Sequence, residues 1–126
     1  MDFQVISTEK APAAIGPYSQ AVKVGEMLFT SGQIPIIPET GVIADGDIAV
    51  QAEQSCKNVQ AIIEAAGGKM DAVVKTTCFL ADMNDFAAFN AVYEKYFISK
   101  PARSCVAVKT LPKGVLCEVE AIALVK

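Results

Sequence analysis

The sequence predicts an α+β domain in which two helices pack on one face of a β-sheet. Two segments show helical periodicity, and strand-forming residues fill the segments before, between and after them. The order is a β-rich start, a helix, a strand, a second helix and a final pair of strands. A length of 126 residues corresponds to about one domain, which we expect to span residues 1–126.

The first half of the chain is predicted to contain a β-hairpin followed by a helix. Residues 19–24 and 27–31 are the hairpin strands, and the Gly-Glu dipeptide at residues 25–26 is the turn. The helix covers residues 47–66, where apolar side chains recur every three or four positions. Its first residue is an aspartate that can accept backbone N–H bonds. The Gly-Gly pair after it can adopt the left-handed conformation that ends a helix.

A strand and a second helix are predicted next. Residues 73–81 are rich in Val, Thr and Phe, which favour a strand. Residues 84–97 place aromatic side chains along one side of a helix, with Asn84 as the expected N-cap. Pro101 prevents this helix from continuing far.

Two strands are predicted at the end of the chain, over residues 104–109 and 115–125. A short turn with a proline and a glycine joins them, so we expect them to pair antiparallel. Alternate positions of the last strand form an uninterrupted apolar row suited to packing under helices. The opposite side carries Glu118 and Glu120 beside apolar residues, and we expect another subunit to bury half of it.

Composition excludes several functional classes. Hydrophobic residues make up 52% and charged residues 20%, which excludes disorder and leaves apolar surface that an oligomer would hide. The net charge of -3, the pI of about 4.9 and ten scattered lysines argue against a general nucleic-acid surface. The absence of histidine excludes His-dependent triads and His metal sites. Four widely spaced cysteines and the lack of a secretory signal predict a reduced cytoplasmic protein without a metal.

Arg103 is the only arginine in the chain, and it lies where a strand is predicted to begin. Its planar guanidinium can grip a carboxylate with two parallel hydrogen bonds, which lysine cannot do. The alternative is a structural salt bridge. Strand alternation places Cys105 on the same face as Arg103. Glu118 shares that face only under one of the possible pairing registers, and the sequence leaves the register open.

Glu118, Glu120 and Cys105 each allow two interpretations. A pair of carboxylates on one strand face can divide acid and base roles, but an exposed Glu-x-Glu on an edge strand is at least as common. Cys105 is either a thiolate nucleophile stabilised by Arg103 or a small apolar wall of a pocket. The lack of a base to activate the thiol favours the wall.

Five motifs resemble those of the RidA family, the reactive imine deaminases formerly called YjgF and also labelled endoribonuclease L-PSP. The motifs are residues 14–21 (AIGPYSQA), 30–35 (TSGQIP), 84–90 (NDFAAFN), 101–106 (PARSCV) and 118–121 (EVEA). They occur in the family's order and cover nearly the whole chain. The resemblance implies a fold similar to the chorismate mutase of bacilli and a homotrimer with clefts between adjacent subunits.

The resemblance also implies an activity without a metal or cofactor. Members hydrolyse enamine and imine acids, such as 2-aminoacrylate, 2-iminopropanoate and 2-iminobutanoate, to 2-keto acids and ammonia. By matching motif, Arg103 would grip the substrate carboxylate and Glu118 would position and activate water. The pocket residues carried over in the same way are Tyr18, Ser31, Asn90 and Cys105.

One departure from the family pattern is visible, and two other functions compete. Members usually carry more residues between the second helix and the PARS motif, whereas only residues 98–100 lie there, which leaves the substrate range open. Because the family is also labelled endoribonuclease and translation inhibitor, RNA cleavage is one alternative, and the acidic pI and lack of histidine argue against it. A non-catalytic binder of small carboxylic metabolites is the other, and the presence of Glu118 argues modestly against it.

Overall fold

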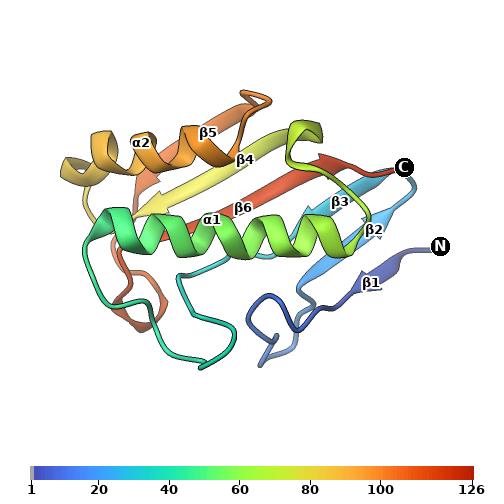
Figure 1. The fold of residues 1–126 in the computed structure, drawn as a ribbon, viewed down its shortest axis with the longest axis horizontal. Coiled ribbons are helices and arrows are strands. Elements are labelled where there is room, and N and C mark those ends of the chain that lie inside the picture. The colour runs from blue at the N-terminus through green and yellow to red at the C-terminus, as the bar shows by residue number, and fades with distance from the viewer. Residues whose placement is uncertain (1) are drawn as a thin grey trace.

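The computed structural model describes residues 2–126, in which six strands form one mixed sheet of order β1-β2-β3-β6-β4-β5. Two α-helices lie side by side on one face of this sheet (Figure 1). The elements are β1 (Gln4–Ile6), β2 (Ala21–Val24), β3 (Met27–Thr30), α1 (Ile48–Ala65), η1 (Met70–Ala72), β4 (Val73–Leu80), η2 (Met83–Asp85), α2 (Phe86–Tyr96), β5 (Ala102–Ala107), η3 (Pro112–Gly114) and β6 (Cys117–Leu124). The predicted α+β class with both helices on one face is confirmed.

The predicted ends of α1 and of the hairpin are also confirmed. The Asp47 side chain accepts a hydrogen bond from the Val50 amide at 3.2 Å and so caps the first turn of α1. Gly67 has a φ of +86°, the left-handed conformation that ends a helix without a Cβ clash. Strands β2 and β3 pair antiparallel across the turn at Gly25, whose φ is +58°.

The start of α2 differs from the expected cap. Residues Met83–Asp85 form the short 3-10 helix η2, and the α-helix begins at Phe86. The Asp82 side chain accepts a hydrogen bond from the Asn84 amide at 2.8 Å. The prediction of Asn84 as N-cap was therefore wrong, because the carboxylate two residues earlier caps this end.

The predicted antiparallel pairing of the last two strands was also wrong. Strand β5 pairs parallel with β4, and β6 lies between β3 and β4, antiparallel to both. The physical reason is that α2 connects β4 to β5, and a crossover helix returns the chain to the same end of the sheet. The loop after β5 then carries the chain past β4 to the centre of the sheet (Figure 1).

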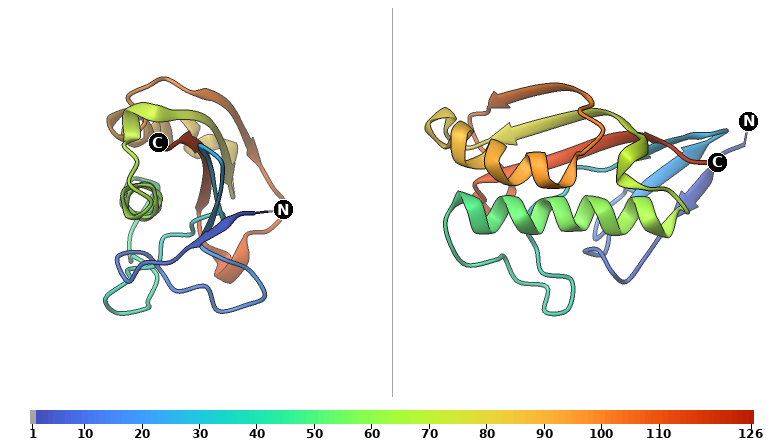
Figure 2. Two further views of the ribbon diagram at one scale, coloured as in Figure 1. Left: turned by 90° about the vertical axis from the view of Figure 1, so that its right-hand side faces the viewer. Right: turned by 45° about the horizontal axis from the view of Figure 1, so that its top comes forward.

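The two faces of the sheet differ in what covers them. The apolar row of β6 and its flanks packs in the core under the helices, as predicted, and each member is at most 2% exposed: Val115, Cys117, Val119, Ala121, Ala123 and Val125. Neither α1 nor α2 covers the other face, here called the helix-free face, which only the short helix η3 borders beside Glu118 within residues 2–126 (Figure 2). Phe29 and Leu124 on that face remain 42% and 44% exposed. No helix in this part of the chain is long and apolar enough to cross a membrane.

Candidate functional site

Five of the six predicted site residues line two separate hollows of one chain, and Cys105 lines neither. Tyr18, Ser31 and Glu118 line a cavity of about 470 Å³, here called the carboxylate pocket. Asn90 and Arg103 line a second hollow of about 610 Å³ between α2 and β5, here called the arginine pocket. The other residues of the carboxylate pocket are Pro12, Ala13, Ile15, Gln20, Gly32, Gln33, Ile34, Ile36, Pro112 and Lys113.

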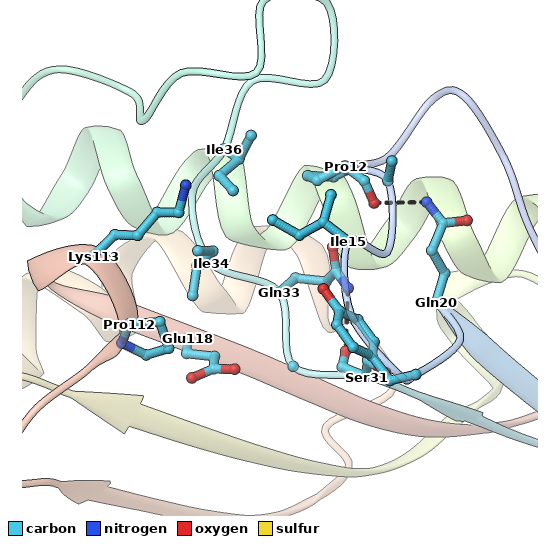
Figure 3. A pocket seen from close by; sticks show the side chains of 13 residues that line it. Pro12, Ile15, Gln20, Ser31, Gln33, Ile34, Ile36, Pro112, Lys113 and Glu118 are labelled. Atoms are coloured by element: carbon cyan, nitrogen blue, oxygen red, sulfur yellow. Dashed lines mark hydrogen bonds between the residues drawn. The ribbon is translucent and has the colours of Figure 1, made fainter.

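Three loops surround the carboxylate pocket, and β6 supplies its acid. The segment before β2 and the segment after β3 form two walls, and Pro112 and Lys113 of η3 form a third (Figure 3). The Glu118 side chain extends from β6 into the space between them. Half of the other twelve lining residues are apolar, and Lys113 is the one cation among them, so the site offers one acid in a partly apolar setting.

Buried glutamines fix the loops of this pocket. Gln20 is 4% exposed, and its amide nitrogen donates to the carbonyl oxygens of Thr8, Ala11 and Pro12. The bond to Pro12 is drawn in Figure 3. Gln33 pairs with Val119 of β6 through two backbone hydrogen bonds, of 2.8 and 3.1 Å. Neither glutamine was predicted from the sequence as a site residue, although a polar side chain between apolar strand positions is a signal of a buried hydrogen-bonding role.

Ser31 is held rigidly at the edge of the pocket. Its hydroxyl donates to the Ser19 carbonyl oxygen at 2.6 Å, and its amide donates to the Gln20 carbonyl oxygen at 2.8 Å. These two bonds join the end of β3 to the segment before β2. The backbone of residues 31–33 is therefore fixed from both sides.

The pKa of Glu118 is raised above its ordinary value. Burial is the larger cause, and the negative charge of Glu120 adds to it. Glu120 faces the same side of the sheet but does not line the pocket. The edge-strand interpretation of this pair was wrong, since β6 lies inside the sheet between β3 and β4. Of the two carboxylates, Glu118 is the one in a position to meet a ligand of this cavity.

In the arginine pocket, neutral groups hold the guanidinium of Arg103. Its Nη1 donates to Asn90 Oδ1 at 2.7 Å. Its central carbon lies 4.7 Å from the centre of the Tyr93 ring and 5.5 Å from that of Phe86. The Tyr93 hydroxyl is in turn 2.6 Å from Thr76 Oγ1. The hydrogen-bond partner of Arg103 is an amide and not a carboxylate. This partner does not neutralise the positive charge of the guanidinium, which can therefore bind an anion.

Cys105 lies on the same face of β5 as Arg103, opposite Cys78 of β4. Burial raises the pKa of the Cys105 thiol, and the nearby Arg103 charge only partly offsets this. The thiol is therefore neutral at physiological pH. This argues against Cys105 as a nucleophile, whereas its role as a wall residue stays a prediction, since it lines neither pocket of the single chain.

Comparison with known proteins places this arrangement in a family. The sequence profile of the Endoribonuclease L-PSP family matches residues 8–125. A RutC family protein of Pyrococcus abyssi is 58% identical over 98% of both chains. The 2-iminobutanoate/2-iminopropanoate deaminase of Escherichia coli is 56% identical over 96% of this chain and 97% of its own.

Solved structures agree with the sequence comparison. The structure of the Escherichia coli YjgF gene product has a TM-score of 0.93 at 54% identity and covers 98% of this chain and 99% of its own. Escherichia coli TdcF, solved with bound serine, has a TM-score of 0.93 at 49% identity and covers 98% of this chain and 99% of its own. From the match along nearly its whole length, in sequence and in fold, the chain belongs to the Endoribonuclease L-PSP family, to which YjgF and the imine deaminases are related.

Proposed function

We propose that this protein hydrolyses small enamine and imine acids to 2-keto acids and ammonia. The observation that carries the proposal is the pair of pockets: a half-buried carboxylate, Glu118, in one, and an arginine whose hydrogen-bond partner is a neutral amide, Arg103, in the other. The reaction requires these two groups, one to hold the substrate anion and one to handle protons. The deaminase name of a relative at 56% identity supports the same assignment.

The active unit in this proposal is a homotrimer with a shared site. Arg103 and Glu118 lie on opposite faces of the sheet in one chain, so one small substrate needs them from two subunits. We propose that Asn90, Arg103 and Cys105 of one subunit face Tyr18, Ser31 and Glu118 of the next. The exposed apolar side chains on the helix-free face of the sheet supply the surface for such contacts.

The chemistry then needs a held substrate and a held water. Arg103 binds the α-carboxylate with its guanidinium fork, which orients the C=N bond. Glu118 takes a proton from water as the water oxygen bonds to the imine carbon, and passes this proton to the nitrogen as the C=N double bond opens, which gives a carbinolamine. Glu118 then takes the proton of the carbinol hydroxyl and transfers it to the nitrogen as the C–N bond breaks, so imine and water become keto acid and ammonia. A raised pKa suits a group that must accept and return a proton near neutral pH.

Two further observations support the proposal. The serine bound to TdcF carries an α-carboxylate, the group that Arg103 would hold here. The thiols of Cys56, Cys78, Cys105 and Cys117 are free, which suits a reducing compartment, and we propose the cytoplasm as the place of the reaction.

The direct test generates 2-aminoacrylate in place with a serine dehydratase and follows ammonia and pyruvate release. We expect the protein to accelerate release beyond the spontaneous rate, and to do so without added metal. No acceleration together with cleavage of a defined RNA would favour the endoribonuclease alternative. No acceleration together with binding of small carboxylic acids would favour the non-catalytic binder.

A further inference from the structure

Gly32 lies closer to Glu118 than any other type of residue would allow. A Cβ atom built on Gly32 would lie 2.2 Å from Glu118 Oε2, 2.8 Å from Cδ and 3.1 Å from Cγ. Contacts below 3.0 Å do not occur for real Cβ atoms, so a side chain at this position and the present place of the carboxylate exclude each other. The carboxylate occupies the space that a side chain of residue 32 would fill.

The backbone conformation does not explain why residue 32 is a glycine. Gly25, Gly41 and Gly67 have left-handed φ values and open space around them, the usual reason for a glycine in a turn. Gly32 has no left-handed φ. Gly32 differs from these glycines because the absence of a side chain leaves room for the Glu118 carboxylate.

We propose that Gly32 is a positioning residue for Glu118, which sets where the carboxylate lies in the carboxylate pocket. This inference rests on the proposed function, since it assumes that the place of this carboxylate governs turnover. A Cβ on residue 32 would displace the carboxylate from the point at which it meets water and substrate.

The surrounding hydrogen bonds indicate whether the backbone at residue 32 or the Glu118 side chain would move if residue 32 carried a side chain. Gln33 is bonded to Val119 through both of its backbone groups, and Ser31 is bonded to Ser19 and Gln20. The backbone on either side of Gly32 is therefore anchored to β6 and to the segment before β2. The Glu118 side chain is the flexible partner, so a methyl group on residue 32 would move the carboxylate and leave the fold in place.

Gly32→Ala is the first variant to measure. We expect an oligomer with near wild-type thermal stability and kcat reduced on the order of 10²-fold, because a displacement of about 1 Å can cost that much in a positioned reaction. KM should change much less than kcat, since Arg103 still holds the substrate. The acid limb of the pH profile should move to lower pH as the displaced carboxylate becomes more exposed to water.

Gly68→Ala is the matched control. Its Cβ would meet the side chains of Ile63 and Val125 at 3.0 and 2.9 Å, in the core and outside both pockets. We expect this variant to lose thermal stability and to keep the wild-type kcat and pH profile. The two alanine substitutions should thus separate positioning from ordinary packing.

A double variant tests the contact itself. Glu118→Asp shortens the acid by one methylene, which withdraws its outermost oxygen from residue 32 and weakens the clash with a Cβ there. We expect Gly32→Ala to reduce kcat much less in the Glu118→Asp background than in the wild type, a non-additive result. If Gly32→Ala alone is insoluble, recovery of soluble protein in the double variant supports the same contact.

Four outcomes would count against the inference, and they can be told apart. Wild-type kcat in Gly32→Ala would overturn it when Glu118→Gln is impaired. Equal losses from Gly32→Ala in both backgrounds, or no recovery of an insoluble variant, would also overturn it. Wild-type turnover by Glu118→Gln would overturn the proposed role of Glu118 first, and this inference with it.

Discussion

Arg103 and Glu118 lie on opposite faces of the same sheet. Arg103 pairs with Thr76 of β4 and Glu118 pairs with Phe79, and these two β4 residues are three positions apart. Side chains alternate between faces along a strand, so an odd separation places the two partners on opposite sides. The arginine meets α2, whereas the acid points to the face that neither α-helix covers. A site that uses both residues on one small molecule must therefore join two chains.

Arg103→Lys tests whether the guanidinium of Arg103 binds the substrate carboxylate. Lysine keeps the charge but loses the planar fork and its contact with Asn90, so one of two hydrogen bonds to the substrate carboxylate is lost. We expect a loss of about 1.5 to 3 kcal/mol in transition-state binding, or roughly 10- to 100-fold in kcat/KM. Steady-state kinetics on 2-aminoacrylate generated in place measures it.

The contrary result for this variant is a stability effect alone. If the arginine only stabilises the fold through Asn90, Tyr93 and Phe86, Arg103→Lys should lower Tm and leave turnover intact. A folded variant with wild-type imine hydrolysis would refute the carboxylate-binding role.

Glu118→Gln and Glu120→Gln should differ sharply. Glu118 lines the carboxylate pocket and Glu120 does not. We expect Glu118→Gln to lose on the order of 10²-fold or more in kcat, the scale for a general base, with the oligomer preserved. Glu120→Gln should change kcat far less. A larger loss from Glu120→Gln in a folded protein would reverse the assignment.

The raised pKa of Glu118 predicts the direction of two pH effects. As a base it must be ionised, so activity should fall with decreasing pH through a midpoint above the ordinary value of 4.5. Glu120→Gln removes the neighbouring negative charge and should lower that midpoint. Acid-limb profiles of kcat measure both effects, and an unchanged midpoint in Glu120→Gln would contradict the coupling.

The same shift has a consequence for stability. Because the fold favours the protonated form, the stability contribution of Glu118 is present below its ordinary pKa and is lost as pH rises through the raised value. Glu118→Gln, which stays neutral, should therefore be at least as stable as the wild type at pH 7. A lower Tm for this variant at neutral pH would contradict the proposed cause.

The proposed trimer leads to a separate prediction, which concerns the exposed apolar side chains on the helix-free face of the sheet. Phe29 pairs with Ile122 there and is 42% exposed in the single chain. We expect a homotrimer by light scattering, and we expect Phe29→Asp to give smaller species without activity, because a charge at a buried contact is costly. A stable wild-type monomer at micromolar concentration would exclude the shared site.

Local signals in the sequence predicted the elements well. The aspartate before α1 and the glycine after it act within a few residues, so the bounds of that helix followed from the chain alone. Strand β1 was not predicted, because three residues give too short a pattern. The cap formed by Asp82 was assigned to Asn84, because aspartate and asparagine side chains can both cap a helix and the sequence does not distinguish between them.

Pairing across the sheet could not be predicted as well. The turn between β5 and β6 favoured a hairpin, although a helix between β4 and β5 is itself a signal for a parallel crossover. The register that separates Arg103 from Glu118 depends on contacts far apart in the chain. The close approach of Gly32 to Glu118 has the same origin, so it is visible only in the folded structure.

Subunit mixing tests the shared site most directly. Arg103→Ala and Glu118→Gln are each expected to be inactive, and equal amounts of the two can be unfolded and refolded together. If each site takes its arginine from one subunit and its acid from the next, random mixing should leave about one quarter of the sites with both wild-type residues. The account predicts return of a corresponding part of wild-type activity. Mixed oligomers as inactive as the separate variants would contradict it, since they would show that both residues act within one chain.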